Sequence, residues 1–239
     1  MSGHSKWSQI KYQKKAADLR RGNLFTKLSN AIAVAARKGG GDPQTNLELR
    51  IAIERAKAQN MPKENIERAI KRGTGELGGA AIEEVRYEAY GPGGTAIIVE
   101  AVTDNKNRTL AQIKSVLNKF GGKLAGAGAV IYLFQRQGEI LVAPPSGLSQ
   151  EEAELAIIDS GANDYQKSGE NYLVYTEPQE VEKVKQQLQQ AGFEIKQADL
   201  TYEPQNPIEI SAEDSQKVIQ LLEALEALDE VKAVHSNMA

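Results

Sequence analysis

The sequence contains no cysteine, two histidines and one tryptophan, and aromatic residues make up 5% of its 239 residues. The absence of cysteine excludes disulfides, thiolate zinc sites and cysteine nucleophiles, and it fits a reducing compartment. No apolar run approaches the roughly 18 residues that a membrane-spanning helix requires. His4 and His235 are too far apart in the sequence to form a ligand cluster, so we expect each at the surface or near a chain end. The composition indicates a soluble, globular protein, and we predict no metal site and no cofactor.

The formal net charge is only -3, but the charge is unevenly distributed along the chain. Residues 1–75 contain 16 Lys and Arg against 6 Asp and Glu, a net charge of +10. The segments 76–100, 101–136 and 137–239 carry net charges of -4, +5 and -14. Such asymmetry between segments is typical of proteins with a polyanionic partner. The basic segments are therefore the candidates for contact with such a partner.

Residues 1–75 are predicted to form a small helical domain. Apolar residues at three- and four-residue spacing predict helices over residues 8–38 (interrupted near 21–23), from Asn46 to Gln59, and from Met61-Pro62 to a cap at Gly73. In the second helix we expect four residues to face inward: Leu47, Leu49, Ile51 and Ile53.

After residue 76 the pattern changes to short strands with interleaved helices. We predict strands over 85–90, 95–103 and 129–134, with a helix over 107–120 before the last of them. This β-β-α-β unit alone has too few strands for a complete sheet. Residues 137–203 give the order β-α-β-β-α-β, the ferredoxin-like arrangement, and a helix over 212–228 and a strand over 231–235 follow. We therefore predict an α+β protein of three domains: a basic helical domain (1–75), a discontinuous middle α/β domain (76–135 plus 204–239) and an inserted acidic ferredoxin-like domain (136–203).

The sequence shows no constellation typical of an enzyme. The segment Gly73 to Gly78 has the G-x-G-x-x-G spacing of dinucleotide sites, but it follows a predicted helix and precedes a strand. Because a dinucleotide site needs the reverse order, we interpret it as a helix cap and linker. The carboxylates of residues 150–230 follow solvated helix faces. We predict that the protein is not an enzyme.

The candidate nucleic-acid-binding residues are cations in three places. In the first 38 residues, like charges at i, i+3 and i+4 repel each other, so this arrangement favours binding to the phosphates of a nucleic acid. At the end of the third helix, the cations either bind phosphate or only complement the helix dipole. At the junction of residues 103–109, an ordinary helix start capped by Asn107 is the alternative to an anion site. The full set is Lys6, Lys11, Lys14, Lys15, Arg20, Arg21, Lys27, Arg37, Lys38, Arg68, Lys71, Arg72, Lys106 and Arg108.

Other interpretations of the charged segments stay open. Trp7 and Tyr12 either stack on bases or anchor the first helix. The basic N-terminus is also compatible with a transit peptide or a membrane arm, although the apolar positions of residues 24–70 favour a bundle. A scaffold whose acidic residues 137–239 dock a basic partner is a further alternative. The same acidic segment could instead dock the N-terminal cations in cis and suppress loose binding to polyanions.

Four motifs carry a resemblance to a known family: Gly3-His4-Ser5-Lys6-Trp7, the run from Asn60 to Gly75, Tyr90-Gly91-Pro92-Gly93-Gly94, and the run from Thr103 to Thr109. With these motifs the sequence resembles the YebC/PmpR family. The resemblance implies the three domains above and a cytoplasmic, DNA-binding transcriptional regulator without catalytic residues or cofactors. Some relatives are instead translation factors that act on ribosomes stalled at proline-rich stretches, so ribosomal RNA is the alternative target. We expect a monomer with no membrane partner.

Overall fold

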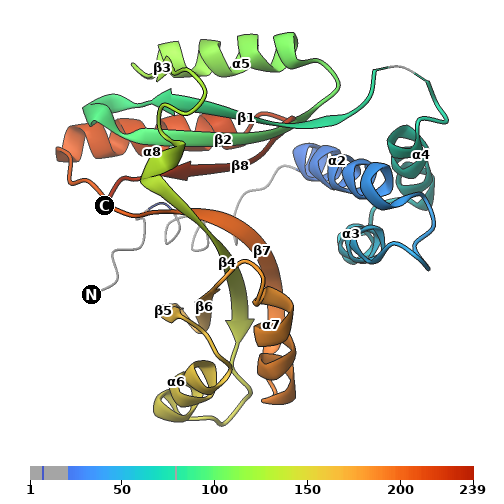
Figure 1. Ribbon diagram of the computed structural model, residues 1–239, viewed down its shortest axis with the longest axis vertical. Helices are drawn as coiled ribbons and strands as arrows, with labels where there is room; N and C mark the ends of the chain where they lie inside the picture. The colour runs from blue at the N-terminus through green and yellow to red at the C-terminus, as the bar shows by residue number, and fades with distance from the viewer. Residues whose placement is uncertain (1–6, 8–20, 79) are drawn as a thin grey trace. The chain divides into compact units, whose positions relative to one another are not determined.

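The computed structural model describes residue 7, residues 21–78 and residues 80–239, with the side chains of residues 21–23 left out (Figure 1). The architecture is mixed α+β, with helices at the N-terminal end and two four-stranded sheets. The described chain forms two compact units. We call residues 21–131 with 210–234 the N-terminal unit, and residues 132–209 with 235–239, to which Trp7 also belongs, the acidic unit. Among the described residues, no helix is long and apolar enough to cross a membrane.

Three helices form the first part of the N-terminal unit: α2 (Arg21–Gly39), α3 (Leu47–Ala58) and α4 (Lys63–Thr74). The predicted helix over residues 8–20 lies outside the described residues. Asn46, the residue at which the second helix was predicted to begin, caps α3, because its side chain accepts a hydrogen bond from the Leu49 N–H. Leu49 and Ile53 face the core, but the inward prediction is wrong for Leu47, which is 56% exposed. The buried stripe of α3 runs through residues 49, 53 and 56, and the first residue of the helix points away from it.

Gly73 is not the cap of α4; that prediction is wrong. The helix continues to Thr74, and Gly75 caps it with a φ of 83°, a conformation that glycine adopts without strain. Gly73 instead lies where α4 crosses α2, and a Cβ there would overlap the carbonyl oxygen of Ala33. The run from Gly73 to Gly78 is therefore a packing contact and a cap, in agreement with its interpretation as a structural motif.

The first sheet has the strand order β3-β1-β2-β8. Its elements are β1 (Glu83–Tyr90), β2 (Ala96–Thr103), β3 (Lys123–Leu124) and β8 (Val231–Ser236), with α5 (Lys106–Lys119) and α8 (Ala212–Glu226) packed together. The predicted strand over 129–134 is wrong: Ile131–Leu133 is a short 3-10 helix, and Lys123–Leu124 is the strand that pairs with β1. Asn105 rather than Asn107 caps α5, since its side chain accepts from the Arg108 N–H.

The second sheet has the order β5-β6-β4-β7 and lies in the acidic unit. Its element order is β-α-β-β-α-β: β4 (Phe134–Ala143), α6 (Gln150–Asp159), β5 (Asp164–Ser168), β6 (Asn171–Thr176), α7 (Val181–Gln190) and β7 (Glu194–Pro204). Both helices cover one face, where Ile140 and Val174 pack against Ile157 of α6 and Leu188 of α7 (Figure 1). Division of the chain into three domains with the predicted boundaries stays a prediction.

His235 was expected at the surface or near a chain end, and it lies near the C-terminal end but is buried, so only the surface placement is wrong. It is 5% exposed, its ring meets the Tyr202 ring edge-on at 5.3 Å between centroids, and its Nδ1 lies 3.3 Å from Thr201 Oγ1. The histidine therefore fills a packing position beside β7. His4 lies outside the described residues.

Candidate nucleic-acid interface

Helix α4 presents two predicted cations to solvent. Ile66 and Ala69 are buried against the other helices, which leaves Arg68 and Lys71 exposed one turn apart. Neither side chain has an ion pair with a carboxylate among the described residues. These two cations are free to contact an anionic partner without first giving up an internal bond.

The side chain of Arg72, the next residue of α4, instead forms hydrogen bonds within the protein. Its Nη1 donates to Asn30 Oδ1 at 3.0 Å and its Nη2 donates to Asp104 Oδ2 at 3.3 Å. Asp104 follows β2, so this pair joins the helical bundle to the first sheet. The guanidinium is already neutralised by a carboxylate, and a phosphate would have to displace it.

Asp104 also binds the second arginine of the predicted junction. Arg108 Nη2 donates to Asp104 Oδ1 at 2.8 Å, and Arg108 Nε donates to Glu230 Oε1 at 2.9 Å. The other carboxylate oxygen of Glu230 accepts from Thr109 Oγ1 at 2.7 Å. The hydrogen bonds that Arg108 donates to Glu230 and Asp104 raise its pKa above the ordinary value. We call Arg72, Asp104, Arg108 and Glu230 the junction network.

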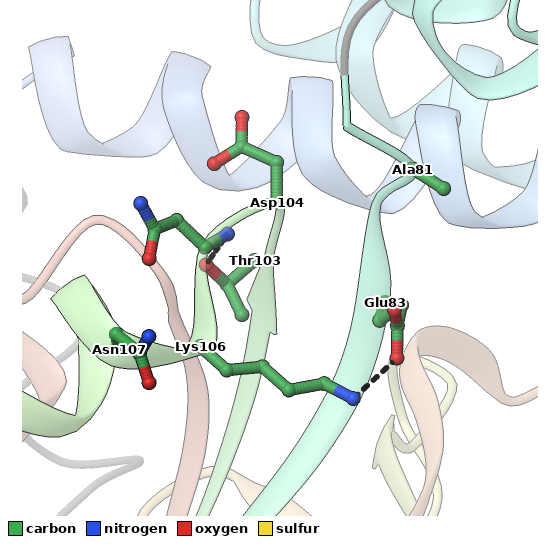
Figure 2. A pocket seen from close by; sticks show the side chains of 7 residues that line it. Ala81, Glu83, Thr103, Asp104, Lys106 and Asn107 are labelled. Carbon is green, nitrogen blue, oxygen red and sulfur yellow. Dashed lines mark hydrogen bonds and ion pairs between the residues drawn. The ribbon is translucent and has the colours of Figure 1, made fainter.

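A shallow pocket of about 390 Å³ opens beside this junction (Figure 2). Its charged lining residues are Glu83, Asp104 and Lys106, and Lys106 Nζ forms an ion pair with Glu83 Oε2 at 2.7 Å. That ion pair lowers the pKa of Glu83, chiefly through the hydrogen bond from Lys106. The pocket thus carries two carboxylates against one ammonium, and its lysine is paired.

The described cations of α2 also bond within the N-terminal unit. Lys27 Nζ donates to the Glu226 carbonyl at 2.6 Å, and Arg37 donates to the Ile82 carbonyl. Lys38 Nζ forms an ion pair with Glu84 Oε2 at 2.7 Å. Lys27 and Arg37 thus bond to backbone carbonyls, whereas Lys38 pairs with a carboxylate.

The remaining predicted residues have no described side chain. Lys6, Lys11, Lys14, Lys15 and Arg20 lie outside the described residues, and for Arg21 only the backbone is described.

Sequence reasoning missed two exposed cations on α3. Arg50 and Lys57 lie seven residues apart, close to one helix face, and neither pairs with a carboxylate among the described residues. Together with Arg68 and Lys71 they form what we call the exposed cation set. The signal was present in the sequence, because Leu49, Ile53 and Ala56 fix the buried stripe and place residues 50 and 57 beside it.

The chain matches two family models. The model described as the TACO1/YebC protein N-terminal domain covers residues 5–76, and the one described as the TACO1/YebC second and third domain covers residues 82–238. The chain belongs to the TACO1/YebC family. The family predicted from the sequence motifs is thereby confirmed.

Curated TACO1/YebC relatives match along the whole chain. A probable transcriptional regulatory protein of Thermoanaerobacter pseudethanolicus is 49% identical over 238 residues, covering 100% of this chain and 97% of its own length. One of the same description from Thermotoga maritima is 47% identical, covering 99% of this chain and 93% of its own. A crystal structure of a conserved hypothetical protein from Aquifex aeolicus has a TM-score of 0.88 at 48% identity, over 98% of this chain and 97% of that one.

Proposed function

We propose that this TACO1/YebC-family protein is a non-enzymatic regulator that acts by binding DNA, through phosphate contacts made by cations of residues 1–75. The relatives named probable transcriptional regulatory proteins support a regulatory role. The proposal includes a cytoplasmic monomer that uses no cofactor.

The observation that carries the proposal is the exposed cation set. Arg50, Lys57, Arg68 and Lys71 are exposed on adjacent helices of one small bundle, in a segment of net charge +10. Each is available to neutralise a phosphate and release its counterions, and such contacts position a protein on nucleic acid without reading its sequence. The paired cations Lys38, Arg72, Lys106 and Arg108 would join only by exchanging a carboxylate for a phosphate.

The test is a titration of labelled duplex promoter DNA by fluorescence anisotropy at several salt concentrations. Arg68→Gln with Lys71→Gln should weaken binding several-fold and reduce the slope of log K against log salt by about two, since each phosphate contact contributes about 0.9. A variant with Lys114→Gln and Lys167→Gln is the control, because it removes equal charge at exposed lysines outside the bundle. Equal losses in both variants would contradict a defined phosphate-binding surface.

Purified ribosomes in a co-sedimentation assay give the second arm of the test. Saturable ribosome binding that depends on Arg68 and Lys71, together with only weak and sequence-independent DNA binding, would replace DNA by ribosomal RNA as the target.

A further inference from the structure

Helix α6 of the acidic unit exposes two large apolar side chains one turn apart. Leu155 is 58% exposed and Ile158 is 55% exposed, and residues three apart in a helix are neighbours on its surface. Among the described residues, the other exposed large apolar side chains do not form such a pair on one helix. Single exposed apolar residues are normal, whereas contiguous ones mark an interaction site.

The packing of α6 on its sheet does not require apolar residues at these two positions. Ala153 and Ile157 form the buried stripe of the helix, which places Leu155 and Ile158 on the side that points away from the sheet. Helix α7 covers the same face of the second sheet, and its exposed residues are glutamate, lysine and glutamine only (Figure 1). The apolar pair of α6 therefore indicates a contact with something other than the sheet.

Carboxylates flank the apolar pair toward both ends of the helix. Glu151 precedes Leu155 by four residues and Asp159 follows it by four, so these three side chains lie along one line of the helix surface. Both carboxylates are exposed, and neither forms an ion pair with a described cation. At 1.5 Å of rise per residue they lie about 12 Å apart along the helix axis, with the apolar pair between them.

The position of Asp159 is unfavourable for the helix by itself. Asp159 is the last residue of α6, where the helix dipole disfavours an anion, whereas Glu151 and Glu152 in the first turn are favourable. The helix contains no lysine or arginine that could offset this charge. A cation supplied by a partner would offset it.

The charge of this surface selects among the classes of partner. A second copy that docked through the same surface would bring carboxylate against carboxylate, and nucleic acid would bring phosphate against it. Residues 136–203 contain 13 Asp and Glu against 5 Lys and Arg, so the surroundings add to this repulsion. The complementary surface is basic and carries apolar side chains between its cations, which is the composition of a basic amphipathic helix.

We propose that Glu151, Leu155, Ile158 and Asp159, which we call the α6 outer face, form a docking site for a basic amphipathic segment of another protein. Apolar side chains of the partner cover Leu155 and Ile158, and a lysine or arginine of the partner meets each of the two carboxylates. This partner has the chemistry that the scaffold interpretation of the acidic segment requires, and α6 gives it a defined place.

The probe for this site is a labelled synthetic peptide of leucine and lysine, about four helical turns long, with its leucines on one face. It is titrated with the full-length protein by fluorescence anisotropy. Leu155→Gln with Ile158→Gln should weaken binding several-fold, and glutamine keeps the helix propensity. Leu47→Gln with Leu77→Gln is the matched control, because these leucines are 56% and 54% exposed and lie in the N-terminal unit.

A second pair of variants tests the charge of the α6 outer face. Glu151→Gln with Asp159→Asn should weaken the peptide several-fold at low salt and reduce the dependence of its affinity on salt, because the apolar contact remains. Glu170→Gln with Glu209→Gln removes the same charge from two exposed carboxylates of the acidic unit. This control should retain nearly all of the affinity.

Three results would overturn the proposal. The first is unchanged peptide affinity in the Leu155→Gln/Ile158→Gln variant with its helix content retained in circular dichroism. The second is an equal loss in either matched control, which would show attraction to the acidic unit without a defined site. The third is equally tight binding of a peptide with glutamate in place of lysine. Self-association in sedimentation that Leu155→Gln/Ile158→Gln abolishes would also overturn it, in favour of a second copy.

The docking site and the proposed function can fail separately. Helix α6 lies outside residues 1–75, so the α6 variants should leave the titration with duplex DNA unchanged. Loss of DNA binding in these variants, with peptide binding intact, would contradict a separate protein-docking role for α6. Peptide binding that responds as expected in a protein without affinity for nucleic acid would leave the docking site standing and remove the proposed function.

Discussion

Glu88 shows how one buried carboxylate can hold a loop. It is 4% exposed on β1, and its oxygens accept hydrogen bonds from the N–H groups of Gly128 (2.8 Å), Val130 (2.7 Å) and Ile131 (3.0 Å). Burial alone would raise the pKa of Glu88, but the three N–H donors together outweigh it and lower the pKa. The ionised form therefore fixes the loop that leads from β3 toward β4.

We expect Glu88→Gln to destabilise the fold by about 1.5–3 kcal/mol near pH 7, the range for hydrogen bonds to a charged group. Because the pKa of Glu88 is lower in the folded protein than its ordinary value of 4.5, its contribution is fully present above pH 4.5. It is lost as the pH falls through the folded value. Urea unfolding at a series of pH values should therefore show the two proteins converging below pH 4.5, and a gap that persists at low pH would contradict this role.

At the scale of elements, capping residues differ in how many helices their side-chain hydrogen bonds join. The Asn105 side chain accepts one hydrogen bond, from the Arg108 N–H, and stays exposed. Asn46 accepts from the Leu49 N–H, and its Nδ2 also donates to the carbonyls of Ala35 and Gly40, each at 2.8 Å. Asn46 thus ties the start of α3 to the end of α2, whereas Asn105 only starts α5.

Alanine substitution should separate these two roles. Asn105→Ala loses one cap and should cost about 1 kcal/mol, while Asn46→Ala also loses the two hydrogen bonds to the Ala35 and Gly40 carbonyls and should cost about 2–3 kcal/mol. The free energy of unfolding in urea measures both, with hydrogen exchange on α2 and α3 as the local readout. Equal costs for the two variants would show that the bonds to α2 contribute nothing.

Elements that depend on local signals could be predicted from the sequence, and those that depend on distant partners could not. Ser149 and Glu152 form the capping box that opens α6, and Asn46 caps α3, because both signals lie within one turn. The strand Lys123–Leu124 has only two residues, so it has no period to detect, and it exists because β1 offers an edge. In the sequence Gly73 has the position of a cap, but in the structure it lies where α4 crosses α2 at Ala33.

At the scale of the whole molecule, the candidate interface too contains features that depend on distant partners and so could not be predicted from the sequence. The charge of residues 1–75 and the exposure of Arg68 and Lys71 could be predicted from periodicity. The pairing of Arg72 and Arg108 with Asp104 could not, because the two arginines are 36 positions apart and converge only through tertiary contact. A count of cations in the sequence therefore overstates how many are free to bind phosphate.

The junction network should accordingly restrain nucleic-acid binding. Asp104 neutralises Arg72 and Arg108 at once, at N···O distances of 3.3 Å and 2.8 Å. Asp104→Asn keeps the shape of the side chain and one acceptor oxygen but removes the negative charge. Arg72 should then become available to phosphate, while Arg108 keeps its ion pair with Glu230, so DNA affinity should rise several-fold and the salt slope should steepen by about one.

The same substitution should lower stability only slightly, by about 1 kcal/mol or less, because partly exposed ion pairs contribute little. Asp229→Asn is the matched control, since it removes the same charge from an exposed side chain of the same unit outside the network. Anisotropy titrations at several salt concentrations, with thermal unfolding alongside, distinguish the outcomes. A gain in affinity shared by Asp229→Asn would reflect net charge alone, and no gain in either would mean that Arg72 serves only to hold α4 against the sheet.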